Sequence, residues 1–231
     1  MTIDRIVGVV ALLISLPAFF LLFLTDRETL GAITLLLGFV IFAATWTYRY
    51  VTNLPPFSVK SVYIRLEFAG TSAKQAHISK EYEIRPNQGH LTMMAHRNIS
   101  ADGQIHNICW NSKPIPAANI ERALGQLKVT VPIELCPKWK VFPGNLSYDL
   151  VDSFERSTEF IQYVSDFPTK VARIHIQMPT GRFCRNVRST KTEGSVETLH
   201  GETAIIGSGA AIKITLRRPP VGTEYAVTWD W

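Results

Sequence analysis

The arginines that follow residue 170 are the first candidates for chemistry in this sequence. Between Lys170 and Lys191 the chain carries no Asp or Glu. Arginine suits phosphate because its planar guanidinium donates two parallel N–H hydrogen bonds to phosphate oxygens. We therefore predict a phosphate-binding site made of four residues: Arg173, Arg182, Arg185 and Arg188. A solvated basic surface, or a patch resting on anionic lipid, explains the same charge pattern.

These arginines can share a site if the segment folds into a hairpin. Residues 171–189 read VARIHIQMPTGRFCRNVRS, with the turn-forming sequence PTG in the middle. Side chains alternate between the two faces of a strand, so a hairpin would bring Arg173 near the second strand. Several guanidinium groups would then lie on one side of the hairpin.

The end of the sequence contains a second candidate binding feature. In GTEYAVTWDW, Tyr225, Val227, Trp229 and Trp231 fall on one face of a strand. Aromatic faces stack on nucleotide bases, so Tyr225 and Trp229 are candidates for stacking on a base. A large aromatic residue at the end of a strand is usually packed, so we expect these side chains to be part of the hydrophobic core, with base stacking as the functional alternative.

Recognisable catalytic motifs are missing from the sequence. The six histidines form no HExxH or HxH spacing, and there is no Cys-x-x-Cys, Gly-x-Ser-x-Gly or phosphate-binding glycine loop. His175 would be a candidate base if Asp166 or Asp152 lay beside it, but an exposed polar side chain is the simpler interpretation. We therefore predict a protein that is not an enzyme and that uses no cofactor, with a hydrolase as the remaining alternative.

Alternating apolar and polar residues predict the strands that must position these side chains. A period of two is typical of half-buried antiparallel strands. It extends over residues 62–68, 127–135, 172–178, 210–216 and 225–231. Turn-forming sequences such as RPNQG, SADG and FPGN lie between the strands, and AANIERALGQ is the one helix candidate. We predict an all-β domain, either an antiparallel up-and-down barrel or a β-sandwich.

Two apolar runs near the start predict a different kind of structure. Residues 6–24 and 30–48 contain 19 residues each and no charged side chain. As helices they would be roughly 28 Å long, close to the hydrocarbon thickness of a bilayer. The sequence TDRETLG between them would form a turn. We predict a two-helix transmembrane hairpin over residues 1–50, although a cleaved signal peptide is an alternative for the first run.

The positions of basic residues predict the orientation of this hairpin. Arg5 precedes the first run, and Arg49, Lys60 and Arg65 follow the second, whereas the turn carries only Arg27. The positive-inside rule then places both termini in the cytoplasm. The odd number of cysteines, three at irregular spacing, fits a reducing compartment.

The remaining chain divides into a linker over residues 51–57 and a β-strand-rich domain over residues 58–231. Two prolines make the linker, VTNLPPF, short and stiff. The formal net charge of +5 would suit an anionic ligand or the inner leaflet of a membrane, and a solvated surface explains it as well.

This architecture resembles the two-transmembrane β-barrel effectors of bacterial cyclic-oligonucleotide antiphage signalling, the SMODS-associated two-transmembrane β-strand-rich class. The two apolar runs, the turn TDRETLG and the strand pattern up to YAVTWDW carry the resemblance. It implies a β domain that senses a cyclic dinucleotide made by a partner synthase. It also implies spans that self-associate as a homo-oligomer and disrupt the bacterial inner membrane, with lipid but no DNA or RNA as a partner. The alternative is a membrane-tethered β module that binds a protein or lipid as a scaffold.

Overall fold

The computed structural model describes residues 38–47, 55–71, 73–87, 93–123, 126–133, 140–194, 196–199 and 203–231. The chain divides into two compact units, Met1–Leu54 and Pro55–Trp231, and the division falls inside the linker expected at residues 51–57. All the strands that the structure describes belong to the second unit, which we call the β domain.

The membrane hairpin predicted from the sequence is not supported by the structure. Residues 6–24 lie outside the described residues, and of the run 30–48 the structure describes a helix over residues 38–47. A membrane-spanning helix needs about 20 apolar residues, and no helix among the described residues is long and apolar enough to cross a bilayer. The predicted two-span hairpin and the inner-membrane location are therefore corrected.

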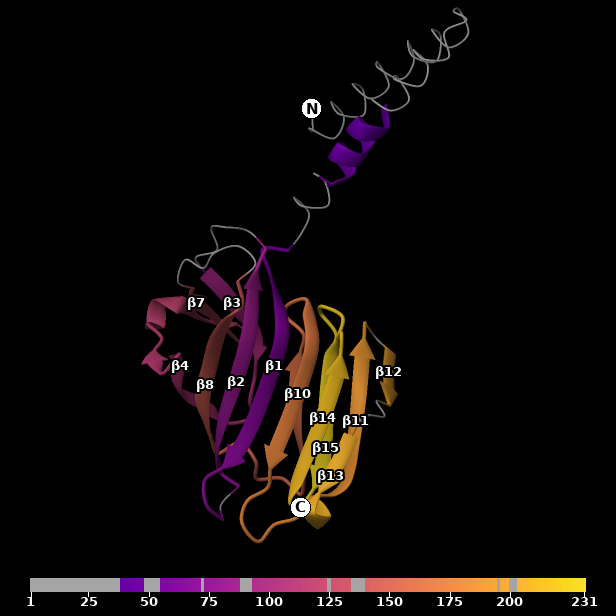
Figure 1. Cartoon of the computed structure of the whole chain (residues 1–231). Helices are drawn as coiled ribbons and strands as arrows, with labels where there is room; N and C mark the ends of the chain where they lie inside the picture. The colour runs from indigo at the N-terminus through magenta and orange to yellow at the C-terminus, as the bar shows by residue number, and fades with distance from the viewer. Residues whose placement is uncertain are drawn as a thin grey trace, which may run out of the picture. The chain divides into compact units, whose positions relative to one another are not determined.

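The β domain is built on one eight-stranded sheet (Figure 1). Its strand order is β13, β14, β10, β1, β2, β8, β4, β5. Strands β1 and β10 are parallel, and the other neighbouring pairs are antiparallel. The strands of this sheet are β1 (Phe57–Phe68), β2 (Gln75–Pro86), β4 (Gln104–Trp110), β5 (Lys113–Pro114), β8 (Phe142–Val151), β10 (Thr169–Gln177), β13 (Thr203–Ile206) and β14 (Ala211–Arg217).

Two smaller sheets pack on one face of the large sheet. One has the order β12 (Val196–Leu199), β11 (Arg185–Glu193), β15 (Glu224–Asp230), β9 (Thr158–Val164). The other has the order β3 (Met93–Ile99), β7 (Gln126–Pro132), β6 (Ile120–Ala123). Short 3-10 turns, η1 (Ala117–Asn119) and η2 (Gly207–Gly209), precede β6 and β14.

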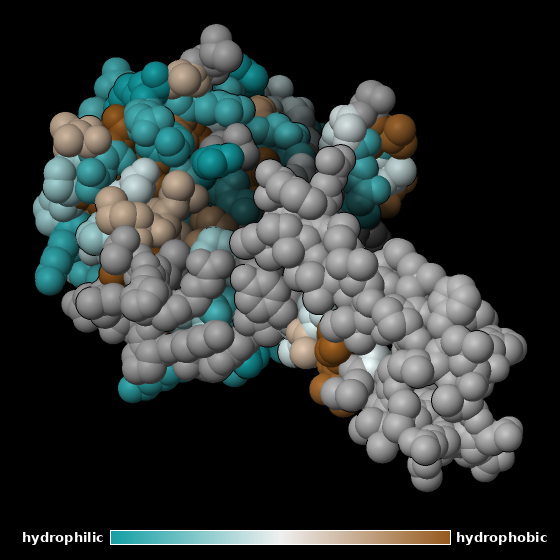
Figure 2. Space-filling view, turned by 90° about the horizontal axis from the view of Figure 1, so that it is seen from above, coloured by the Kyte–Doolittle hydropathy of each residue, from teal (hydrophilic) through white to brown (hydrophobic). Residues whose placement is uncertain are grey.

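The hydrophobic core lies between the large sheet and the two smaller sheets. In β1 the alternate residues Val62, Ile64 and Leu66 are buried, and they join a cluster with residues of both smaller sheets, such as Val129 and Trp229. The opposite face of the large sheet carries polar residues such as Arg65, His77 and Arg173. Figure 2, which views the molecule from above, shows a largely hydrophilic coloured surface at that end. Burial of the alternate residues is therefore the force that stacks the sheets.

Two of the predictions for the β domain need correction. Strands are confirmed within each of the five alternating segments, but they do not form a closed barrel, because the large sheet ends at β13 and β5. The predicted helix AANIERALGQ is also wrong: after η1 the chain enters β6, which pairs with β7. Strand pairing outweighs the weak helical propensity of this segment, and Lys128 of β7 binds Glu121 of β6 at 2.9 Å.

Candidate functional site

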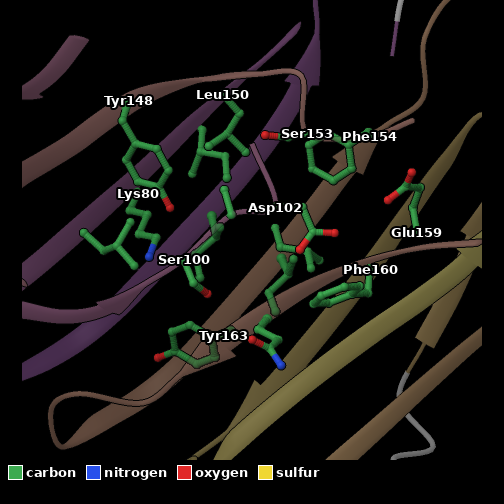
Figure 3. A pocket seen from close by; sticks show the side chains of 17 residues that line it. Lys80, Ser100, Asp102, Tyr148, Leu150, Ser153, Phe154, Glu159, Phe160 and Tyr163 are labelled. Atoms are coloured by element: carbon green, nitrogen blue, oxygen red, sulfur yellow. The ribbon is translucent and has the colours of Figure 1, made fainter. Parts of the chain in front are cut away.

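A cavity of about 310 Å³ lies where the two smaller sheets leave part of the large sheet uncovered. Its floor is apolar and comes from the inner face of the large sheet, with Ile64, Ile78, Leu150 and Ile174. Its walls are residues 99–102, at the end of β3, and residues 159–163 of β9. Among the described strands, both β3 and β9 are edge strands of their sheets, so the cavity lies between the end of β3 and the free edge of β9. Figure 3 shows the side chains that line it.

Lys80 is the cation of this cavity. The alternation of β2 turns Ile78, Lys80 and Tyr82 toward the inner face. Lys80 therefore lies on the same face as two buried side chains. The ammonium lies 5.8 Å from the centre of the Tyr148 ring, a contact that stabilises a partly desolvated cation by about 0.5–2 kcal/mol. Among the described residues, Lys80 makes no ion pair.

The two carboxylates of the cavity wall already have partners. Asp102 binds the Arg156 guanidinium, with 3.2 Å between Oδ2 and Nη2. Glu159 is buried, and its Oε1 accepts a hydrogen bond from the Arg156 backbone N–H. Burial raises the pKa of the Glu159 carboxyl, and this hydrogen bond opposes the rise. Among the described residues, Lys80 is therefore the one lining cation of this cavity, and no carboxylate forms an ion pair with it.

Hydroxyl groups complete the polar part of the lining. Tyr148, Tyr163, Ser100 and Ser153 lie around the cavity (Figure 3). Burial is the main cause that raises the pKa of Tyr163, so this phenol stays protonated and able to donate a hydrogen bond at neutral pH. The described lining contains neither histidine nor cysteine.

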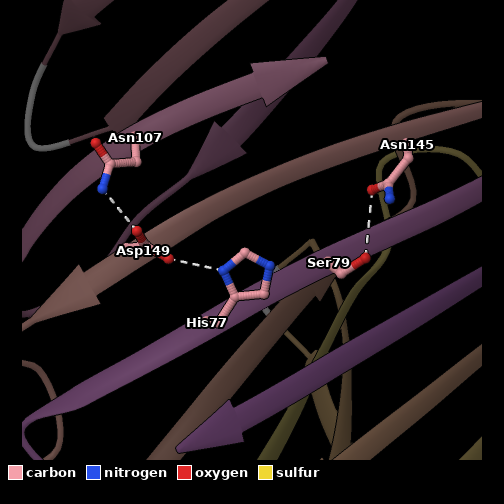
Figure 4. A network of polar contacts seen from close by, with 5 residues as sticks. All are labelled: His77, Ser79, Asn107, Asn145 and Asp149. Carbon is pink, nitrogen blue, oxygen red and sulfur yellow. Dashed lines mark hydrogen bonds and ion pairs between the residues drawn. The ribbon is translucent and has the colours of Figure 1, made fainter. Parts of the chain in front are cut away.

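A second polar cluster lies on the outer face of the large sheet (Figure 4). His77 Nδ1 lies 2.7 Å from Asp149 Oδ1, and the Asn107 amide donates to the other carboxylate oxygen at 2.8 Å. Hydrogen bonds from His77 and Asn107 lower the pKa of Asp149. Ser79, two residues along β2, donates instead to Asn145 at 3.3 Å. The cluster is exposed, and we interpret the contact between His77 and Asp149 as an interaction that joins β2 to β8.

The four predicted phosphate-binding arginines do not come together as a hairpin. Arg173 is on β10 of the large sheet, opposite Tyr63 of β1 and Thr215 of β14. Arg185 and Arg188 are on β11, which pairs with β15 in the four-stranded sheet. The Arg182 guanidinium lies over the Trp231 ring, 5.2 Å from its centre. Phosphate binding by these residues stays a prediction, but the predicted β10–β11 hairpin is wrong.

The aromatic candidates at the end of the chain are core residues in the structure. Tyr225 stacks on Tyr163 with ring centres 6.4 Å apart, and Trp229 stacks on Phe154 at 6.1 Å. Tyr225 is 4% exposed and Trp229 is fully buried. This agrees with the expected core position, and stacking on a base would require these rings to become exposed.

His175 has a tyrosine partner. Its Nδ1 lies 2.9 Å from the Tyr63 hydroxyl on the outer face of the large sheet. Burial and the nearby Lys213 and Arg65 lower the pKa of His175. Asp166, one of the two carboxylates considered as its partner, accepts a hydrogen bond from the Arg97 backbone N–H.

Lys80 was not among the candidates taken from the sequence, although a local signal marks it. In the strand HISKEYEI, the residues of one face are Ile78, Lys80, Tyr82 and Ile84. A charged residue at a position where the alternation predicts an apolar one indicates either an edge strand or a functional site. In the structure β2 has strands on both sides, so the edge explanation is excluded. The sequence alone does not show this pairing.

Comparisons with known proteins do not establish a family. No family model and no curated protein matches the chain. Among solved structures, an M1 zinc metallopeptidase from Deinococcus radiodurans is 9% identical with a TM-score of 0.38, covering 75% of this chain and 42% of that one. Yeast LTA4 hydrolase in complex with bestatin is 11% identical with a TM-score of 0.42, covering 74% of this chain and 28% of that one. Legionella pneumophila aminopeptidase A in complex with aspartic acid is 10% identical with a TM-score of 0.39, covering 78% and 22%.

This chain therefore spans less than half the length of those proteins. The scores are too low to carry an argument about activity. Among the described residues, no group of three or more His, Cys, Asp or Glu side chains is placed to hold a metal ion.

Proposed function

We propose that the β domain is a non-enzymatic binding module whose cavity takes a small amphipathic molecule with one anionic group. The observation that carries the proposal is Lys80, a cation that lies beside the apolar floor of the cavity without an ion-pair partner among the described residues. Removing a charge from water is costly unless it is paired. A ligand anion would supply the missing partner, and the apolar floor would hold the rest of the ligand.

The charge balance of the cavity favours a carboxylate over a phosphate ester. One lysine neutralises a single negative charge, and the walls also contain Asp102 and Glu159. A dianion would be repelled by these groups. The cyclic dinucleotide implied by the resemblance carries two phosphates and fits this cavity less well, so its binding by the predicted arginines stays a separate prediction.

Titration with hexanoate tests the proposal, with hexanamide as the neutral probe of similar shape. We expect hexanoate to bind and Lys80→Met to weaken it about 10-fold or more, because a hydrogen bond to a charged group contributes about 1.5–3 kcal/mol. Lys60→Met is the matched control, because Lys60 is exposed and lies near Glu83, 3.7 Å away, outside the cavity. Equal binding of acid and amide, or no effect of Lys80→Met, would contradict the proposal.

A further inference from the structure

We infer that the ligand of this cavity is the C-terminal end of an extended peptide, bound through its carboxylate to Lys80 and through its backbone to β9. The inference rests on the proposed function, because it uses the same cavity and the same lysine. It adds the chemical class of the ligand, which follows from the strand edge that forms one wall.

Among the described residues, no strand pairs with the edge of β9 that borders the cavity. Strand β9 is the last strand of its sheet, and β15 is its only strand partner among the described residues. At one end of the β9–β15 ladder Ser165 donates its N–H to Thr223, and at the other Trp231 donates to the Ser157 carbonyl. Hydrogen-bonded positions alternate along an antiparallel strand. The backbone N–H and C=O groups of the odd-numbered residues of β9 therefore point toward β15. Those of Phe160, Gln162 and Val164 point toward the free edge.

The opposite wall does not compete for these groups with a strand of its own. Strand β3 ends at Ile99, and the wall continues as residues 99–102. Upstream, the Arg97 backbone N–H is already bound by Asp166, with 3.1 Å between N and Oδ2. An added strand would therefore pair with β9, the edge that extends along the cavity from residue 159 to residue 163.

The lining of the cavity suits an extended peptide whose C-terminus lies at Lys80. Alternate side chains of a strand point to opposite faces, so one set would reach the apolar floor at Ile64, Ile78 and Ile174. Lys80 pairs in register with Ile64 of β1, so its ammonium enters from the floor itself. A cavity of about 310 Å³ holds a short segment rather than a long one. A terminal carboxylate is the anion that every peptide has at such a position.

The experiment compares two pools of N-acetylated tetrapeptides with apolar residues at alternate positions, one with a free C-terminal carboxylate and one amidated. We expect the acid pool to bind the full chain and the amide pool to bind at least 10-fold more weakly. Gln162→Pro should weaken the acid pool at least 10-fold, because proline removes an N–H at the free edge while leaving the β15 ladder intact. Gln162→Ala is the matched control, because it keeps the N–H while it loses the lining side chain and its hydrogen bond to Glu224, which the proline variant loses as well.

Hydrogen exchange provides a second measurement that does not need a variant. Peptide binding should slow exchange of the Phe160, Gln162 and Val164 amide protons on the free edge. If hexanoate binds through Lys80 but the acid pool neither competes with it nor protects these amides, the peptide inference is overturned and the proposed function stands. If Lys80→Met changes neither hexanoate nor peptide binding, the proposed function fails as well. Equal loss of peptide binding in Gln162→Pro and Gln162→Ala would also overturn strand addition.

Discussion

His96 is a buried histidine in the middle of an aromatic cluster. Its ring lies 5.1 Å from that of Tyr82 and 5.6 Å from those of Trp110 and Phe167, centre to centre. Nδ1 is 3.3 Å from the Tyr82 hydroxyl, and Nε2 has no hydrogen-bond partner among the described residues. Burial, with a smaller contribution from the charge of Lys80, lowers the pKa of His96 to about 3. The folded protein therefore holds this imidazole neutral.

The free energy of unfolding should fall as the pH drops from about 6.5 toward 3. In this range the unfolded chain binds a proton at His96 that the folded chain does not bind, because the pKa of His96 is about 3 in the fold and 6.5 otherwise. The contribution approaches about 1.4 kcal/mol per pH unit. Urea unfolding at several pH values measures the slope. His96→Leu should reduce it by about this amount, and the exposed control His106→Gln should not; equal slopes in all three proteins would contradict the assignment.

At the scale of elements, close contact between β4 and β8 depends on a glycine. Trp110 of β4 pairs in register with Leu146, and its indole ring covers Gly144 of β8. A Cβ added at Gly144 would lie 2.4 Å from Trp110 Cη2 and 3.2 Å from Ile84 Cδ1. Real Cβ atoms do not approach so closely, so the tryptophan would have to move. The glycine is therefore required by packing.

Gly144→Ala should lower the free energy of unfolding by about 1–3 kcal/mol, which is typical of overpacking a well-filled core. The same substitution in a Trp110→Leu background should cost less, because the atoms that the methyl group meets are gone. A double-mutant cycle from chemical denaturation measures this coupling. Additive effects of the two substitutions would show that the contact does not explain the glycine.

At the scale of the whole molecule, the β domain contains a complete hydrophobic core. The buried cluster of the described residues extends from Phe57 to Trp229, all within the unit Pro55–Trp231. The two smaller sheets and the large sheet contribute to this one cluster, so removal of either smaller sheet would expose the inner face. We therefore treat residues 55–231 as the unit that folds and binds.

Residues 55–231 produced without residues 1–54 should unfold in one cooperative thermal transition. A shared core predicts two-state behaviour and a midpoint within about 5 °C of that of the full chain, because a loss of 1 kcal/mol shifts the midpoint of such a domain by about 2–4 °C. Calorimetry and circular dichroism measure the thermal unfolding of residues 55–231 and of the full chain. Two separate transitions of residues 55–231 would contradict the shared core. A midpoint lower by tens of degrees than that of the full chain would show that residues 1–54 contribute to the stability of this unit.

The sequence by itself determined where most of the predicted strands lie and which side chains face the core. Val62, Ile64 and Leu66 alternate with polar neighbours, and they are buried in β1. This follows because side-chain direction along a strand is a local property with a period of two. Likewise, Trp229 could be assigned to the core as one alternative from its neighbours alone.

Only the tertiary structure decided which strands meet. Arg173 and Arg185 are close in sequence but lie in different sheets, whereas β1 and β10 are far apart in sequence and pair in parallel. Pairing depends on burial shared between distant segments, which no local pattern contains. For the same reason the candidate site was not predicted from the sequence: the local pattern marks Lys80 as a strand edge or a site, and only the pairing of β2 on both sides and the position of β9 beside the cavity decide between them.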